Sequence, residues 1–109
     1  MVRKVARIRS RALVGVLRNG ERESAYLRDY STEGVCLEGL RSVMAGDVLR
    51  LHCKGAFISA EVRWVREGRA GLCYLPSCPP GEKTRFLAAV SRGQKPASAA
   101  RIYGFSELA

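Results

Sequence analysis

Histidine is almost absent from this chain, which has one, His52, among 109 residues. No Cys-x-x-Cys pair occurs, and His52 stands beside a cysteine, so the two side chains would point to opposite faces of a strand. Zinc ligands usually come in close pairs from turns, and this pattern gives no support for a metal site. We interpret the cysteines as small thiols that fill the core; they are Cys36, Cys53, Cys73 and Cys78.

Motifs of catalysis are also missing. The sequence contains no nucleophile elbow, no phosphate-binding loop and no cluster of metal-ligating residues. With one histidine and none of these motifs, there is little from which a catalytic mechanism could be built. We therefore expect a protein that is not an enzyme, with no cofactor, no metal and no catalytic residues.

Long apolar stretches are absent as well. No segment approaches the roughly 20 apolar residues that a membrane-spanning helix needs. The N-terminal "MVRKVARIRS" is basic, but no unbroken apolar segment follows it, which argues against a secretory signal peptide. We expect a cytoplasmic protein without a membrane span.

Acidic side chains are scarce relative to basic ones. Lys and Arg number 19 against 10 Asp and Glu, for a formal charge of +9. Fifteen of the basic residues are Arg, whose guanidinium makes planar bidentate contacts to phosphates and to guanine edges. The excess favours an anionic partner such as a nucleotide, a nucleic acid or a membrane surface. A solvated basic surface without a ligand remains the alternative.

What the chain does contain is a series of short strand patterns. The candidate strands are residues 12–17, 24–30, 34–39, 48–53, 56–65 and 72–75. Turn signals separate them, among them the hairpin dipeptide Asn19-Gly20. Short strands with glycine-containing turns between them predict a mainly β domain, either a small antiparallel barrel or a sandwich.

The spacing of apolar residues changes after the last predicted strand. Residues 81–93, "GEKTRFLAAVSRG", place apolar residues at helical spacing, which predicts a helix over an open end of the barrel. The following "QKPASAA" has the composition of a linker. We therefore predict one domain over residues 1–93, with an Arg-rich N-terminal arm and a C-terminal helix, and a tail over residues 94–109.

The stretch "DYSTEG" between two of the predicted strands carries the candidate chemistry. Asp29 can accept hydrogen bonds from the N1 and N2 hydrogens of guanine, and Ser31 offers a hydroxyl. Gly34 has no Cβ, so the backbone could turn sharply or a ligand could approach closely. The alternative is an ordinary hydrogen-bonded β-turn, since Asp, Ser and Gly are common turn residues.

Arginines upstream complement this stretch. Arg3 and Arg7 stand four residues apart, as do Arg7 and Arg11. An extended N-terminal segment could wrap them around an anion, with each guanidinium holding a phosphate or the O6 and N7 acceptors of guanine. Donors for phosphate and acceptors for guanine are the two kinds of group that a cyclic diguanylate would need.

Together these motifs resemble the signature of the PilZ family, bacterial receptor domains for cyclic di-GMP. That signature is Arg-x-x-x-Arg followed further along by Asp or Asn-x-Ser-x-x-Gly. Here "RKVAR" (residues 3–7) or "RIRSR" (residues 7–11) supplies the first half, and "DYSTEG" (residues 29–34) matches the second. The resemblance extends over about residues 3–92.

The resemblance implies a six-stranded antiparallel barrel of the split-barrel type with a C-terminal helix, and cyclic di-GMP as the ligand. The implied ligand-binding residues are Arg3, Arg7, Arg11, Asp29, Ser31, Gly34 and Trp64. Two points stay open: which arginine pair forms the motif, and whether Trp64 packs against a guanine or lies in the core.

The leading functional hypothesis is a receptor or adaptor that transmits the level of cyclic di-GMP to an unidentified protein effector. One alternative is a PilZ-like interaction module that has lost nucleotide binding. Another is a small basic barrel that binds RNA or single-stranded DNA. Nucleic acid is the less favoured partner, because the aromatic residues form no clustered stacking motif.

Overall fold

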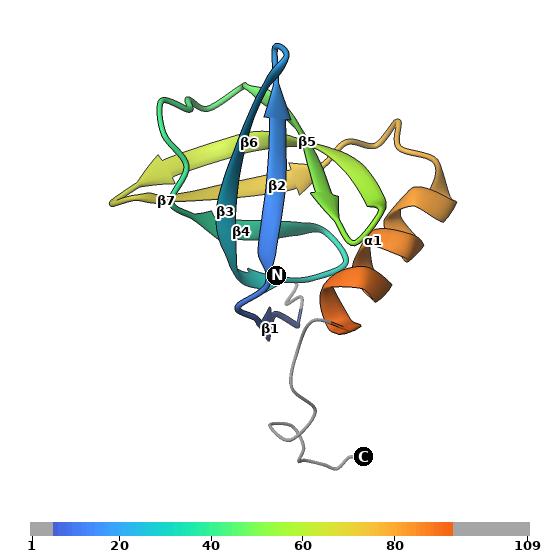
Figure 1. Ribbon diagram of the computed structural model, residues 1–109. Coiled ribbons are helices and arrows are strands. Elements are labelled where there is room, and N and C mark those ends of the chain that lie inside the picture. Colours follow the sequence, from blue (N-terminus) through green and yellow to red (C-terminus); the bar gives the residue numbers. More distant parts are fainter. Residues whose placement is uncertain (1–5, 93–109) are drawn as a thin grey trace, which may run out of the picture.

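The computed structural model describes residues 6–92, which form strands and a C-terminal helix (Figure 1). The strands are β1 (Ile8–Arg9), β2 (Leu13–Arg18), β3 (Glu21–Tyr30), β4 (Gly34–Glu38), β5 (Val48–Cys53), β6 (Ala56–Arg66) and β7 (Arg69–Tyr74), and the helix is α1 (Pro80–Arg92). Arg3 and the predicted tail over residues 94–109 lie outside the described residues.

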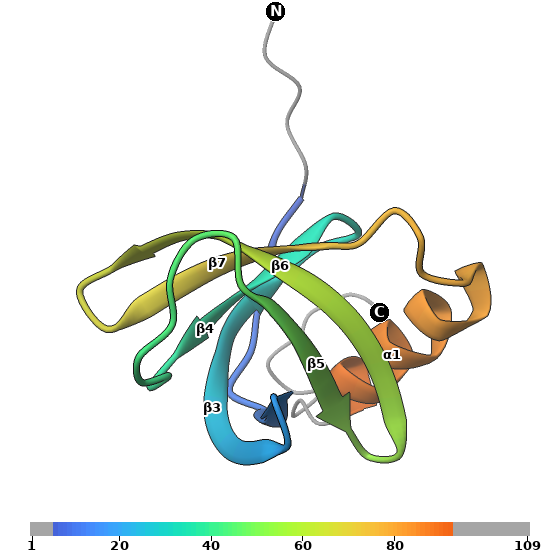
Figure 2. The ribbon, with the colours of Figure 1, turned by 90° about the horizontal axis from the view of Figure 1, so that it is seen from above.

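Six of the strands close into an antiparallel barrel. Their order is β3-β2-β5-β6-β7-β4, and β4 pairs again with β3. Closure is possible because β3 is long: its residues 21–26 pair with β2, and its residues 26–30 pair with β4. Seen from above, the strands curve around a common interior (Figure 2). The predicted six-stranded barrel with a C-terminal helix is confirmed.

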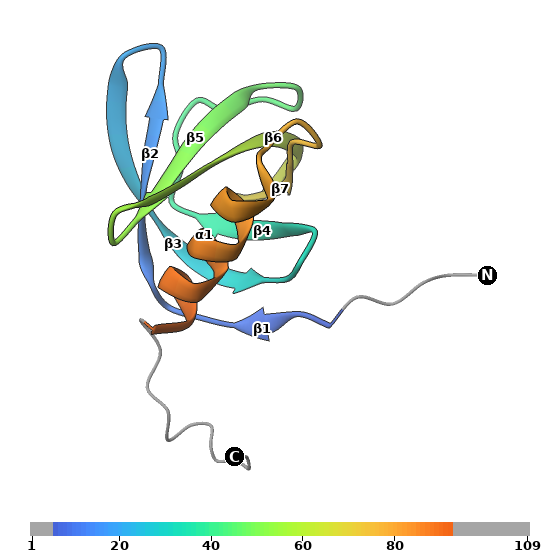
Figure 3. The ribbon, with the colours of Figure 1, turned by 90° about the vertical axis from the view of Figure 1, so that its right-hand side faces the viewer.

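β1 is an addition to that barrel. It pairs with the end of β3, with Ile8 opposite Tyr30 and Arg9 opposite Asp29. Figure 3 shows β1 outside the barrel, beneath the end of β3. This short strand holds Arg9 and its immediate neighbours against the end of β3.

Three tight hairpins set the strand register. Each has a non-glycine residue followed by glycine, both at positive φ: 51° and 82° at Asn19-Gly20, 49° and 84° at Lys54-Gly55, and 53° and 77° at Glu67-Gly68. Positive φ at both central residues is the geometry of the type I′ turn, whose twist matches that of the flanking strands. The Asn-Gly hairpin predicted from the sequence is therefore present.

The barrel interior is filled by the inward-facing residues of its strands. The largest fully buried side chains on the strands are Leu27, Leu37, Leu49, Leu51, Ile58, Val14, Val35 and Val62. Along β5 and most of β6, buried residues alternate with more exposed ones, as expected when one face of a strand meets the core. Each fully buried aliphatic side chain contributes roughly 1.5–3 kcal/mol through removal of apolar surface from water.

α1 shares the core of the barrel. Phe86, Ala89 and Val90 have no exposed surface and pack among the buried strand residues. The Phe86 ring meets Tyr74 of β7 edge-on, with centroids 6.3 Å apart. The helix begins at Pro80, a position where proline is favoured because its missing N–H has no helical partner in any case. Among residues 6–92, no helix has the length and apolar character that a membrane crossing requires.

Polar contacts hold both ends of the helix. Near its start, Arg50 of β5 donates from Nη2 to Glu82 Oε2 at 2.9 Å. This hydrogen bond keeps the pKa of Glu82 below its ordinary value. Near its end, the hydroxyls of Tyr30 and Ser91 are hydrogen-bonded at 2.9 Å. The helix is thereby anchored to β5 at one end and to the end of β3 at the other.

Replacing Phe86 with alanine tests whether the helix belongs to the folding unit. We expect Phe86→Ala to lower the free energy of unfolding by about 3–5 kcal/mol, because the lost ring leaves a cavity between helix and barrel. Urea denaturation measures the change. The exposed neighbour Arg85 is the control, and Arg85→Ala should change stability by less than about 0.5 kcal/mol. A similar small effect for both variants would contradict the shared core.

Candidate functional site

A β-bulge in β3 turns Asp29 to the outer surface of the barrel. The pairing with β4 advances by two residues on β3, from Leu27 to Asp29, and by one on β4, so Arg28 is the extra residue. In a regular strand Asp29 would face the same side as Leu27, which is fully buried. The bulge shifts the alternation by one position, so Asp29 faces outward and Tyr30 faces the core.

A second bulge acts in the same way on Trp64. Between Val62 and Trp64, β6 uses two residues where β7 uses one, and Arg63 is the extra residue. Val62 is fully buried, and unbroken alternation would put Trp64 into the core with it. Instead the indole lies outside, with 37% of the residue exposed. Trp64 therefore lies on the surface and not in the core, and its contact with a guanine stays a prediction.

The two re-aimed residues stand in one row across four strands. Asp29 lies opposite Cys36 of β4, Cys36 opposite Gly71 of β7, and Gly71 opposite Trp64 of β6. At about 4.8 Å per strand, the row spans about 14 Å of sheet surface. The indole lies directly on Gly71, since a Cβ there would overlap Trp64 Nε1. The row therefore has a carboxylate at one end, an aromatic ring at the other and little side-chain bulk between them.

Asp29 is paired with an arginine of the N-terminal segment. Arg7 donates from Nε to Asp29 Oδ1 at 2.7 Å, just before β1 begins. The side chains of Arg7 and Asp29 are 45% and 25% exposed, respectively. An ion pair this exposed contributes about 0–1 kcal/mol to stability. It is therefore weak enough to be exchanged for contacts with another partner.

Ser31 organises the turn that follows Asp29. Its Oγ accepts hydrogen bonds from the backbone N–H groups of Glu33 at 3.0 Å and Gly34 at 3.3 Å. The Ser31 carbonyl accepts from the Tyr74 hydroxyl at 3.1 Å. With 3% of its surface exposed, Ser31 serves the turn, as the β-turn alternative from the sequence anticipates.

Gly34 is required by the approach of two strands. A Cβ at Gly34 would overlap the carbonyl oxygen of Leu72 in β7. Backbone atoms cannot move aside as the end of a flexible side chain can, so β4 and β7 would have to separate. The glycine thus permits close strand packing beside the turn.

Further arginines surround the row from Asp29 to Trp64. Arg66 lies 5.2 Å from the centroid of the Trp64 ring and opposite Arg69 across β6 and β7. On the other side, Arg28 Nη1 donates to Glu38 Oε1 at 3.3 Å. This outer face therefore combines one aromatic ring with several guanidinium groups, a combination suited to planar anionic ligands.

The thiol in the middle of the row is not an activated nucleophile. Burial raises the pKa of Cys36, and the Asp29 carboxylate raises it further, against the opposing charges of Arg28, Arg7 and Arg69. A thiol with a raised pKa remains protonated near neutral pH. Within residues 6–92, no group of three or more His, Cys, Asp or Glu side chains is placed to hold a metal ion.

The residues predicted from the sequence fall into separate groups. Arg7, Asp29 and Trp64 lie on the row or at its end. The other two predicted residues of "DYSTEG", Ser31 and Gly34, support the turn. Arg11 lines a hollow with His52 and Lys54 on β2 and β5. Arg3 is not among the described residues.

Sequence reasoning missed Arg28, Arg66, Arg69 and Gly71 as members of this face. No local motif marks them, because the face depends on the pairing of β3 with β4, β4 with β7 and β7 with β6. The available signal was the "EGRAG" hairpin, which brings Arg66 and Arg69 together but does not say what lies beside them.

A closed β-barrel with a carboxylate, an exposed indole and several arginines on one face defines a small binding module. In the comparison with protein families, the PilZ domain matches residues 2–90. The chain therefore belongs to the PilZ domain family, a family of binding and adaptor modules that includes receptor domains for cyclic di-GMP.

Among solved structures, the crystal structure of the uncharacterized Legionella protein Lpg0364 is similar, with a TM-score of 0.52 and 13% sequence identity. The match covers 80% of this chain and 91% of that chain. At this identity the similarity shows the fold alone. A search of curated proteins found no match.

Substitution of Gly34 tests the origin of the glycine in the motif. We expect Gly34→Ala to destabilise the protein by about 3 kcal/mol, at the upper end of overpacking effects, because the new methyl group meets backbone atoms. Thermal unfolding measures the change. Gly81→Ala is the matched control: its methyl group would meet only the flexible end of Arg85, and in a helix it should be neutral or stabilising by about 0.5–1 kcal/mol. Equal effects of the two substitutions would argue against the packing explanation.

Proposed function

We propose that this domain is a receptor for cyclic di-GMP, with the nucleotide bound on the outer face between Asp29 and Trp64. The observation that carries the proposal is the row across β3, β4, β7 and β6, which brings a carboxylate, an indole and flanking arginines to one surface. A cyclic dinucleotide offers two guanines and two phosphates, so it can engage these groups at the same time.

Asp29 is the acceptor for a guanine Watson–Crick edge in this proposal. Its carboxylate can receive hydrogen bonds from the N1 and N2 hydrogens of the base. The contact of Asp29 with Arg7 is an exposed ion pair, so the arginine can turn towards a phosphate or a purine N7 at little cost. Ser31 and Gly34 support the site by holding the turn in place.

Trp64 is the stacking surface for a base. The indole lies against Gly71, and Arg66 approaches its ring. Aromatic rings on a protein surface stack on nucleobases with about 1–3 kcal/mol per base. One guanine of the ligand would stack on Trp64, and the second would bind at the other end of the row, beside Arg7 and Asp29.

The arginine pair that fits this site is Arg3 and Arg7. Arg7 stands beside Asp29, whereas Arg11 lines the hollow on β2 and β5. With Arg7 as the second arginine of Arg-x-x-x-Arg, Arg3 is the first. Both would grip phosphate oxygens or guanine acceptors by bidentate hydrogen bonds.

The output of the receptor is contact with a protein effector. Binding can change this contact only if the nucleotide has different affinities for two arrangements of the N-terminal segment. A PilZ-like module without nucleotide binding is the competing function, and a nucleic-acid-binding barrel is the less favoured one.

Calorimetric titration tests the receptor function. We expect cyclic di-GMP to bind tightly and saturably, and GTP and a short RNA to bind far more weakly, because each offers only part of the ligand. Binding of GTP with equal affinity, or no heat from cyclic di-GMP, would favour a module without this ligand.

The same titration of Arg7→Ala should show an affinity lower by more than about tenfold, from loss of a charge-assisted contact of about 1.5–3 kcal/mol.

Arg11→Ala is the matched variant in that titration, since it removes an arginine from the same segment. It should bind cyclic di-GMP almost as well as the unmodified protein. If Arg11→Ala weakens binding as much as Arg7→Ala while Arg3→Ala has no effect, Arg7 and Arg11 form the motif instead.

The single tryptophan of the chain provides a direct signal. Because Trp64 is exposed, we expect cyclic di-GMP to quench and shift its fluorescence as a guanine covers the ring. Trp64→Leu should keep the fold, since the residue lies outside the core, and weaken binding by on the order of 1–3 kcal/mol. Saturable binding by calorimetry without any change in fluorescence would remove Trp64 from the site.

A further inference from the structure

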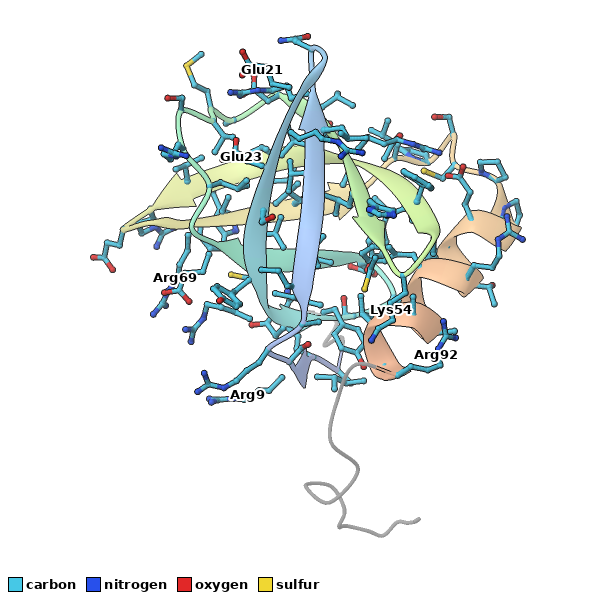
Figure 4. The ribbon with its side chains drawn as sticks, in the orientation of Figure 1. Arg9, Glu21, Glu23, Lys54, Arg69 and Arg92 are labelled. Atoms are coloured by element: carbon cyan, nitrogen blue, oxygen red, sulfur yellow. The ribbon has the colours of Figure 1, made fainter. Side chains whose placement is uncertain are left out.

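A hollow of about 470 Å³ lies on the outer face of β2 and β5. It shares no lining residue with the row from Asp29 to Trp64. In Figure 4, Lys54 of the hollow appears beside Arg92 on one side of β2 and β3, and Arg9 and Arg69 appear on the other. The hollow is therefore a second surface, separate from the proposed nucleotide site.

The floor of the hollow is a glycine between larger neighbours. Ser24, Gly15 and His52 stand opposite one another across β3, β2 and β5, and Phe57 of β6 follows His52. A Cβ at Gly15 would lie 3.3 Å from His52 Nδ1. The His52 ring is stacked on Phe57, with centroids 4.5 Å apart, and this contact fixes the wall. The depression exists because Gly15 has no side chain.

The charge of the hollow has one sign. Arg11 and Lys54 line it, and its lining residues include no carboxylate. Burial raises the pKa of Cys53 beneath the hollow, and the charges of Lys54 and Arg92 both act against that rise. A third cation at the end of α1 therefore adds to the positive field.

Apolar surface adjoins this basic hollow. Leu13 forms part of the wall and lies opposite Tyr26 on β3. These residues are 57% and 59% exposed, respectively, so two large side chains remain in contact with water side by side. Cations beside exposed apolar groups complement a chain that carries a carboxylate next to an apolar side chain.

We propose that this hollow docks an acidic segment of a partner protein, with a carboxylate between Arg11 and Lys54 and an apolar side chain on Leu13 and Tyr26. The proposal extends the proposed function, because the segment would belong to the protein that the receptor controls, but docking can be tested without cyclic di-GMP. Two cations beside one pair of exposed apolar side chains suit a carboxylate with an apolar neighbour, whereas a nucleic acid strand would need a longer basic track with stacking surfaces along it.

The wall of the hollow is continuous with the segment that leads to the nucleotide site. After Arg7, the chain runs along β3: Ser10 donates from its backbone N–H to the Arg28 carbonyl at 2.9 Å, and Leu27 donates to the Ala12 carbonyl at 2.8 Å. Arg11 lies between these two hydrogen bonds. A change in the partners of Arg7 therefore acts on the same short segment that places Arg11.

Amide chemical shifts of the full chain test the docking site. The probe is a short blocked peptide that alternates Glu and Leu, and the control peptide carries Gln in place of every Glu. We expect saturable shifts at Gly15, Ser24 and Lys54 with the Glu peptide, which weaken as salt is added, and no saturation with the Gln peptide.

Two variants alter the hollow in different ways. Gly15→Thr fills the floor and leaves every charge in place. Lys54→Asn removes a charge at a residue with φ of 49°, a conformation that asparagine tolerates. Each variant should lower the affinity for the Glu peptide by about tenfold. Arg41→Gln, which removes an exposed charge outside the hollow, should bind as the unmodified protein does.

Several outcomes would overturn the proposal. They are the absence of saturable shifts, equal binding of the Gln peptide, and full affinity in both hollow variants. An oligouridylate that saturates the same amides more tightly than the peptide would indicate RNA, and inorganic phosphate doing so would indicate a site for small anions. Normal cyclic di-GMP binding without peptide binding would refute the docking site alone, and the reverse result would refute the proposed receptor function alone.

Discussion

One extra residue in each of two strands decides which side chains face solvent on this barrel. Arg28 in β3 and Arg63 in β6 interrupt the alternation that otherwise sends every second residue into the core. A carboxylate in the core would need a buried partner, and an indole there would displace several smaller side chains. The bulges place Asp29 and Trp64 on the outer surface instead. Both lie in one row across the sheet, which passes through Gly71 on β7. The face proposed to bind nucleotide exists because both bulges are present.

The stretch "DYSTEG" contains two residues that stabilise the local backbone and one residue, Asp29, whose carboxylate faces outward. The hydroxyl of Ser31 caps the turn, and Gly34 lets β4 lie against the backbone of β7. Asp29 stands at the edge of this rigid turn with its carboxylate outward. A group held on a rigid element keeps its geometry without further ordering cost, which favours precise recognition. Arg7, by contrast, lies on the segment just before β1, and its side chain is 45% exposed in the ion pair with Asp29.

The domain has two surfaces with one chain segment between them. The proposed nucleotide surface and the basic hollow have no lining residue in common, and the segment from Arg7 to Leu13 contributes to both. The segment is tied to β3 by backbone hydrogen bonds on both sides of Arg11. The proposed receptor function requires two arrangements of this short segment, which the nucleotide would bias on one side and the proposed partner on the other.

The sequence by itself determined a mainly β domain with a C-terminal helix and the motif whose resemblance to the PilZ signature implied a barrel. Strands with period-two alternation, hairpin dipeptides such as Asn19-Gly20 and a helical pattern before Gly93 are local signals, so they could be interpreted without knowing the fold. Only the tertiary structure decided which residues share a face. Trp64 lies in phase with Val62 along the chain, and nothing local announces the bulge that separates their directions. A side chain at Gly34 is excluded because its Cβ would overlap the carbonyl oxygen of Leu72. Arg11 lies on a different surface from Arg7 because the chain passes from one surface to the other between them. These outcomes depend on register between strands distant in sequence, and that register is set by the packing of the whole barrel.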